Sequence, residues 1–118
     1  MALSDVERNI LLQARDAVRK CEHTFICYAI DKAEASGYRL DEVRKAKTRL
    51  LWYIHNALGV NATLGGWLAK KYGNHWFNDY DLQRKARIAW IDWMLGEEPV
   101  FDRKTRSLLK KRMKPIGA

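Results

Sequence analysis

The stretch of sequence that decides the fold is DEVRKAKTRLLWYIHNALG, residues 41–59. Its apolar residues recur with a period of about 3.6, which is typical of a helix with one buried face. They are Val43, Ala46, Leu50, Ile54, Ala57 and Leu58. Leu40 before Asp41 is a hydrophobic lead-in to an N-terminal cap, and Gly59 is a stop signal. The sequence therefore predicts a long amphipathic helix in this region.

Two helices are predicted before this stretch. Ser4 and Glu7 have the spacing of a capping box, and apolar residues follow at helical intervals, which predicts a first helix from Asp5 to Lys20. A second apolar stripe predicts a helix from Thr24 to Ser36, which Gly37 ends by adopting the left-handed conformation.

Further helices are predicted after it. Thr63 caps a short helix that closes at Gly73, and Asp81 caps a helix with a broad apolar face that ends at Gly96. Asp102 caps a last, basic helix. Since no run with the strand period competes, we expect an all-α fold, a compact bundle of five or six helices with a basic C-terminal helix or tail.

Length and composition exclude several classes of protein. The chain has 118 residues, 47% hydrophobic and 31% charged, which fits one globular domain and neither a disordered nor a fibrous chain. No apolar run approaches the roughly 18 to 20 residues that cross a bilayer, and the first residues lack a secretory pattern. We expect a bundle domain over residues 1–98, a basic segment over 99–118, a cytoplasmic location and no membrane contact.

The positive charge is concentrated at the end of the chain. There are 22 Lys and Arg against 14 Asp and Glu, and after position 102 every charged residue is basic. Such a segment either attracts an acidic protein or nucleic acid, or only keeps the protein soluble. The residues predicted to contact a partner are Arg103, Lys104, Arg106, Lys110, Lys111 and Arg112.

Residues 43–78 contain no Asp or Glu and carry a secondary basic patch. Its members are Arg44, Lys45, Lys47, Arg49, Lys70 and Lys71. The first four spread over more than one face of a helix, which weakens the argument for a stripe that follows nucleic-acid phosphates.

Aromatic residues are also dense in this half of the chain, and most are expected in the core, including Trp67, Trp90 and Trp93. Trp76 and Phe77 differ because they lie in a polar loop. They either fold back over the bundle as a lid, anchor a protein partner, or stack on bases beside Lys70 and Lys71.

Candidates for metal binding or catalysis are weak. Cys21, His23 and Cys27 lack the paired spacing of a zinc site, a disulfide between the cysteines is not expected, and Cys27 is predicted to be a small buried thiol. His75, Asp79 and Asp81 form a cluster that suits a metal-dependent hydrolase, but a helix that follows needs a capping carboxylate at the same place. We expect no enzyme activity, no metal and no cofactor.

Four sequence blocks carry a resemblance to known proteins. They are HTFICYAI (residues 23–30), LWYIHNALG (51–59), TLGGWL (63–68) and RIAWIDWML (87–95). Together, over Thr24 to Leu95, they are similar to small, mostly uncharacterised accessory proteins of tailed bacteriophages and prophages. The resemblance implies a phage-encoded protein in the bacterial cytoplasm that redirects host machinery or counters host defence, and it implies no residue roles.

The expected function is therefore non-enzymatic binding of a host macromolecule, most of all a host protein with an acidic surface. The alternative is a nucleic-acid-binding protein that uses the same basic residues, and a third is the metal-dependent hydrolase. Homo-oligomer formation is left open by the sequence.

Overall fold

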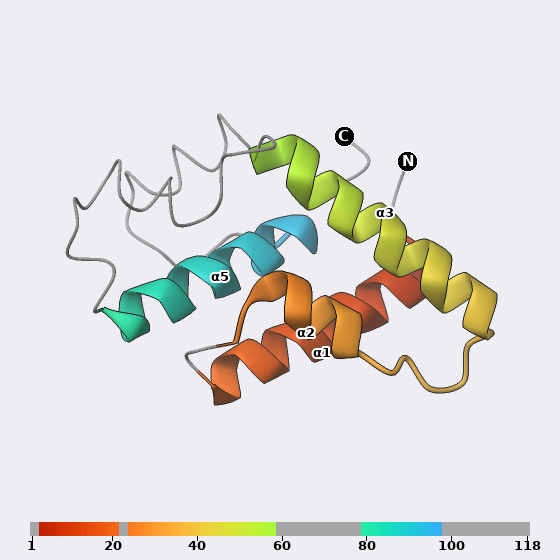
Figure 1. Ribbon diagram of the computed structural model, residues 1–118, viewed down its shortest axis with the longest axis horizontal. Coiled ribbons are helices and arrows are strands. Elements are labelled where there is room, and N and C mark those ends of the chain that lie inside the picture. Colours follow the sequence, from red (N-terminus) through yellow and green to blue (C-terminus); the bar gives the residue numbers. More distant parts are fainter. Residues whose placement is uncertain (1–2, 22–23, 59–78, 98–118) are drawn as a thin grey trace.

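The computed structural model describes residues 3–21, 24–58 and 79–97, and these residues form four helices and no strand (Figure 1). The helices are α1 (Asp5–Lys20), α2 (Ile26–Lys32), α3 (Leu40–Leu58) and α5 (Tyr80–Met94). The predicted all-α class is confirmed. The short helix predicted from Thr63 to Gly73, the last basic helix and the domain boundary at residue 98 lie outside the described residues.

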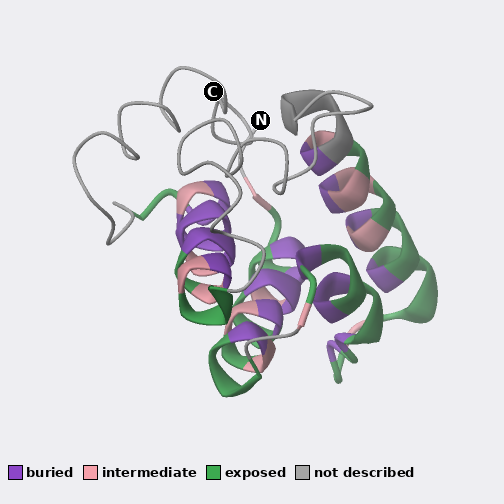
Figure 2. Cartoon of the chain, turned by 60° about the vertical axis from the view of Figure 1, so that its left-hand side comes forward, coloured by how far each residue is buried: buried purple, intermediate pink, exposed green. Residues whose placement is uncertain are grey.

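α1 is the central helix of the described bundle, because it packs against α2, α3 and α5, while α2 also contacts α3. None of the described helices combines the length and the apolar character needed to cross a bilayer. The buried surfaces of α1, α3 and α5 face one another around a common interior (Figure 2). The largest fully buried side chains include Ile10 and Leu11 of α1, Leu50 of α3 and Trp90 of α5.

The capping box predicted at the start of α1 is confirmed. The Glu7 amide donates to Ser4 Oγ at 3.2 Å, and the Ser4 amide donates to Glu7 Oε1 at 2.9 Å. These two bonds satisfy amides that the first turn of a helix leaves without partners. The predicted bounds, Asp5 to Lys20, are those observed.

α2 is shorter than the predicted helix from Thr24 to Ser36, because contacts with other helices end it at Lys32. Lys47 Nζ of α3 donates to the Asp31 carbonyl at 2.6 Å, and the Glu34 amide donates to Gln13 Oε1 of α1 at 3.1 Å. Backbone groups that would continue the helix are thereby used by neighbouring helices. The predicted end at Ser36 was wrong, although Gly37 has the expected left-handed φ of +92°.

The long helix α3 begins at Leu40 and continues to Leu58, which confirms the long amphipathic helix that the sequence predicts in this region. Val43, Ala46, Leu50 and Ile54 are buried, as their period predicts. The start differs in one respect. The Val43 amide donates to the Arg39 carbonyl at 3.0 Å, so that Asp41 lies inside the first turn and is not the cap.

α5 is capped at its N-terminus by Asp79, whose Oδ1 accepts the Leu82 amide at 2.9 Å. The prediction that Asp81 is the cap was wrong by two residues. At the other end, Gly96 has a φ of +81°, and the Glu97 amide donates to the Asp92 carbonyl at 2.9 Å. This is a Schellman motif, in which a left-handed glycine lets the chain turn back onto the last carbonyls.

Candidate functional site

Most of the residues predicted to contact a partner lie outside the described part of the chain. The structure places the part of the basic patch that lies on α3. It also places four of the candidates for metal binding or catalysis, which are Cys21, Cys27, Asp79 and Asp81. Those outside it are Arg103, Lys104, Arg106, Lys110, Lys111, Arg112, Trp76, Phe77, Lys70, Lys71, His23 and His75.

The two acids of the predicted hydrolase cluster both have structural partners. Asp79 caps α5, and Asp81 pairs with Lys85 Nζ at 2.9 Å and with Arg84 Nη2 at 2.5 Å. The hydrogen bonds from Lys85 and Arg84 lower the pKa of Asp81 below its ordinary value. A carboxylate held in this way stays ionised and stabilises the first turn of α5.

The two cysteines are separate and exposed. Cys21 is the residue that ends α1, Cys27 lies in α2, and neither is in a disulfide. The prediction that Cys27 is a small buried thiol was wrong, because Ile26, Ala29 and Ile30 form the buried side of α2. Among the described residues, no three His, Cys, Asp or Glu side chains gather as metal ligands would.

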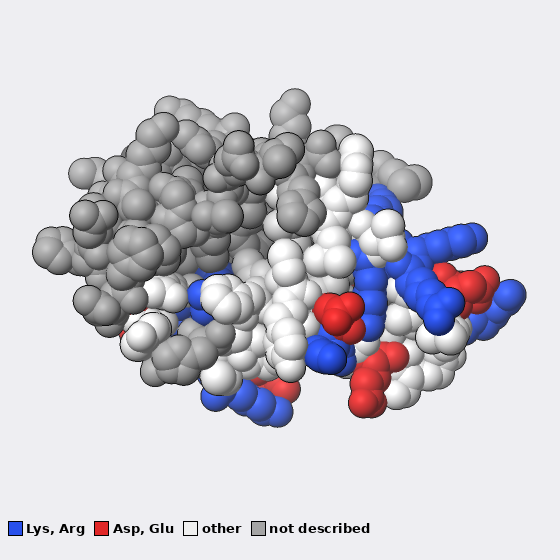
Figure 3. Space-filling view, in the orientation of Figure 1, with Lys and Arg blue, Asp and Glu red and all other residues white. Residues whose placement is uncertain are grey.

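The basic patch on α3 divides into two parts. Lys47 points to α2, where it holds the Asp31 carbonyl. Arg44, Lys45 and Arg49 line an open groove of about 430 Å³ together with Thr48 and Trp52. Figure 3 shows Lys and Arg side chains gathered over the α3 part of the molecule, with acidic side chains among them. This groove is the candidate functional site, and "the α3 groove" denotes its five lining residues below.

Trp52 is the functional candidate that the sequence analysis missed. It is 68% exposed, although most aromatic residues of this region were expected in the core. The sequence did hold a signal, since Trp52 is two positions from both Leu50 and Ile54 and a step of two residues turns a helix by about 200°. The period that buries those residues places Trp52 on the outer side of α3.

Arg49 is fixed in the groove by a carboxylate from another helix. Its Nη1 lies 2.5 Å from Glu7 Oε1, and Glu7 is only 2% exposed. The same carboxylate oxygen accepts the Ser4 amide, so the cap of α1 and the guanidinium of the groove share one acceptor. A cation held by a buried partner has fewer rotamers to lose when it binds a ligand.

Thr48 contributes differently to the groove. Its hydroxyl donates to the Arg44 carbonyl one turn earlier, at 2.9 Å. Because its single proton is used within the helix, Thr48 has only acceptor capacity left for a ligand. Anion recognition in the α3 groove therefore depends on the two guanidinium groups and the ammonium group.

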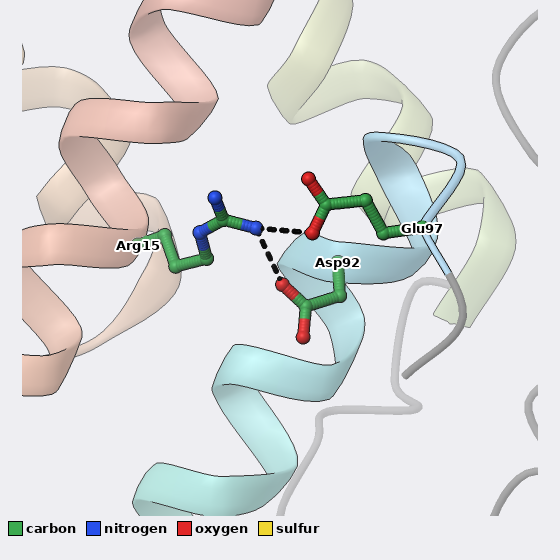
Figure 4. Close-up of polar contacts among 3 residues, drawn as sticks. All are labelled: Arg15, Asp92 and Glu97. Carbon is green, nitrogen blue, oxygen red and sulfur yellow. Dashed lines mark hydrogen bonds and ion pairs between the residues drawn. The ribbon is translucent and has the colours of Figure 1, made fainter. Parts of the chain in front are cut away.

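A second interhelical ion cluster stabilises the bundle away from the groove. Arg15 Nη1 of α1 donates to Asp92 Oδ1 at 2.8 Å and to Glu97 Oε2 at 2.5 Å, so that one nitrogen lies between two carboxylates (Figure 4). The side chains of Arg15 and Asp92 are 14% and 7% exposed. The cluster ties α1 to the C-terminal end of α5, and its charges are used within the fold.

Comparison with protein-family models, with curated proteins and with solved structures found no match to this chain.

Proposed function

We propose that this protein acts by binding an acidic surface of another protein, with the α3 groove as a contact surface. The observation that carries the proposal is the arrangement of Arg44, Lys45 and Arg49 around the exposed indole of Trp52. Protein interfaces are enriched in Arg and Trp, because both provide large contact areas and directional contacts. Positive charges beside such an anchor select a partner with acidic side chains and accelerate the encounter.

The proposed role is recognition without catalysis. The groove offers guanidinium, ammonium and indole groups, together with a hydroxyl whose proton is already used. These groups suit the binding of carboxylates, which accept bidentate hydrogen bonds from Arg in particular.

The resemblance to bacteriophage accessory proteins adds to this proposal that the partner is a bacterial host protein. The basic segment that begins at Arg103 would then increase the rate of encounter with an acidic partner. Trp76 and Phe77 are proposed as additional apolar anchors.

A capture experiment with matched variants tests this function. The tagged full-length protein, the groove variants Lys45→Glu and Trp52→Ala, and the control Arg19→Glu are used to capture partners from bacterial lysate treated with nuclease. Arg19 is an exposed cation on α1, so its reversal changes the net charge as much as Lys45→Glu does. A discrete protein that the wild type and the control retain, and that both groove variants lose, is the expected result.

Two outcomes would overturn the proposal. If all four proteins retain the same partner equally, the α3 groove is not the contact surface. If a parallel capture from lysate without nuclease treatment retains only nucleic acid, and nuclease or moderate salt releases it, the protein is a nucleic-acid binder. Phosphate binding would then show a log–log salt slope near −0.9 per neutralised duplex phosphate.

A further inference from the structure

The α3 groove has a regular order along the helix. Arg44 and Lys45 form its first level, Thr48 and Arg49 its second, and Trp52 its third. Successive levels are four residues apart, which places them about 6 Å from one another along the axis. The groove therefore presents cations in two successive turns and an aromatic side chain in the next.

This order matches the side chains of another helix lying along α3. Residues at i, i+4 and i+8 lie on one face of a helix at about 6 Å from one another along its axis, and residue i+7 lies on the same face. Acidic residues at the first two positions would face the two cationic levels. An apolar residue at the third would face Trp52, as in the common mode in which an amphipathic helix docks in a groove.

The charges around the groove favour a short acidic segment over a long polyanion. Asp41 and Glu42 are exposed in the first turn of α3, directly before the cationic levels. The described residues as a whole carry 13 Lys and Arg against 11 Asp and Glu, so they present little net positive charge. A nucleic-acid strand carries phosphates along its whole length and would approach the acids as well as the cations.

We infer that the α3 groove binds an acidic amphipathic helix of the partner, which presents two carboxylates one turn apart and an apolar side chain in the following turn. This inference rests on the proposed function and specifies its ligand. Glu7 holds Nη1 of Arg49 at the second level, so the ligand's second carboxylate would be bound by the other N–H groups of that guanidinium.

A designed peptide tests the inference directly. The probe is an end-capped, Ala-based helical peptide with two Glu residues four positions apart and Leu residues three and four positions further on, carrying a fluorescent label. A control peptide of the same composition has the two Glu residues on opposite faces. Binding to the full-length protein is measured by fluorescence anisotropy, beside a labelled single-stranded oligonucleotide.

The expected result is specific to the groove and to the spacing. The probe should bind the wild type and Arg19→Glu equally, and about tenfold more weakly to Lys45→Glu and to Trp52→Ala. Both side chains are exposed, and circular dichroism should confirm unchanged helical content for each variant. The control peptide should bind more weakly than the probe.

Equal binding of the two peptides, or binding of the probe that Lys45→Glu leaves unchanged, would overturn the inference. So would tighter binding of the oligonucleotide that depends on the same residues. If the lysate partner depends on the groove but the probe does not bind, the helical ligand is wrong while the proposed function stands. If neither the lysate partner nor the probe is affected by the groove variants, the proposed function and the helical ligand are both wrong.

Discussion

The guanidinium of Arg49 in α3 donates a hydrogen bond to the carboxylate of Glu7 in α1, with Nη1 2.5 Å from Oε1. The other carboxylate oxygen, Oε2, is buried and has no hydrogen-bond partner among the described residues. Glu7 therefore depends on Arg49 for most of the compensation of its buried charge. An ion pair of this kind is costly to break on one side, because the remaining charge stays buried.

We expect Arg49→Met to lower the free energy of unfolding by about 2 to 3 kcal/mol, since it leaves the Glu7 carboxylate without its cation. The double variant Glu7→Gln and Arg49→Met should recover most of this loss, because Gln can still complete the capping box. Urea denaturation of the four proteins of this double-mutant cycle measures the coupling. Additive effects of the two substitutions would show that the pair contributes no interaction energy.

The same pair predicts an effect on binding whose sign is informative. Glu7→Gln removes a negative charge next to the groove, which by electrostatics alone should strengthen the binding of an acidic peptide. If Glu7 instead positions Arg49, the affinity should fall about threefold, because the guanidinium regains rotamers. We expect the affinity of Glu7→Gln for the designed peptide to fall. A rise in this affinity would show that Glu7 does not position Arg49 for binding.

Adjacent leucines in α1 provide a matched test of the core. Leu11 is fully buried, whereas Leu12 is 42% exposed. We expect Leu11→Ala to lower the free energy of unfolding by about 3 to 5 kcal/mol, from lost burial and from the cavity left behind. Leu12→Ala should cost about 1 kcal/mol or less, since Leu12 is already 42% exposed to water and leaves little cavity. Similar losses in chemical denaturation would contradict this orientation of α1.

The turn after α5 depends on the backbone conformation of Gly96. Its φ is +81°, and a Cβ added there would meet no atom within 4 Å. Gly96→Ala should therefore cost about 1 kcal/mol through the backbone conformation alone. Gly96→Asn should cost less, because Asn tolerates the left-handed region better. Thermal unfolding of the two variants distinguishes the conformational cost from a steric clash, which would make Asn the worse substitution.

The hydroxyl of Tyr53 predicts a dependence of stability on alkaline pH. Burial raises its pKa to about 12, and it has no hydrogen-bond partner within the described part of the chain. An unfolded tyrosine ionises near pH 10, so between pH 10 and 12 the unfolded state loses a proton that the folded state keeps. The free energy of unfolding therefore falls as the pH rises from 10 to 12, because the unfolded state is stabilised by ionisation of Tyr53 and the folded state is not.

We expect Tyr53→Phe to reduce the loss of stability between pH 10 and 12 by about 1 kcal/mol, after allowance for partial solvent exposure. Near neutral pH the variant should be about as stable as the wild type, because the lost hydroxyl makes no hydrogen bond there. Parallel pH curves for the two proteins in urea denaturation would show that Tyr53 ionises in the folded state as readily as in the unfolded state.

Local sequence signals predicted several elements correctly. These elements depend on residues within one or two helical turns. They are the capping box of Ser4 and Glu7, the start and end of α1, the period of α3 and the turn at Gly96. Capping, helical period and left-handed glycine are short-range effects, which is why they are visible without knowledge of the rest of the chain. The burial of Trp90 was also predicted, because it lies within the apolar stripe of α5.

Other features required the packing of helices that are distant in sequence. The end of α2 at Lys32 depends on Gln13 and Lys47, and the placement of Arg49 depends on Glu7, 42 positions away. The four cations of α3 were predicted to spread over more than one face of the helix, which is correct for Lys47. The other three share a groove with Trp52 that this prediction did not include.

The sequence by itself determined the helical class, because the period of its apolar residues and its caps act over a few residues each. Only the tertiary structure decided which cations are used inside the fold and which line a surface. Arg15 and Lys47 hold neighbouring helices, whereas Arg44 and Lys45 line a surface beside an exposed indole. Arg49 does both, because it pairs with Glu7 of α1 and lines the same groove. The physical reason is that the role of a long charged side chain depends on which group its charged end contacts. That group often lies on a different helix, so only the packing of the helices determines the contact.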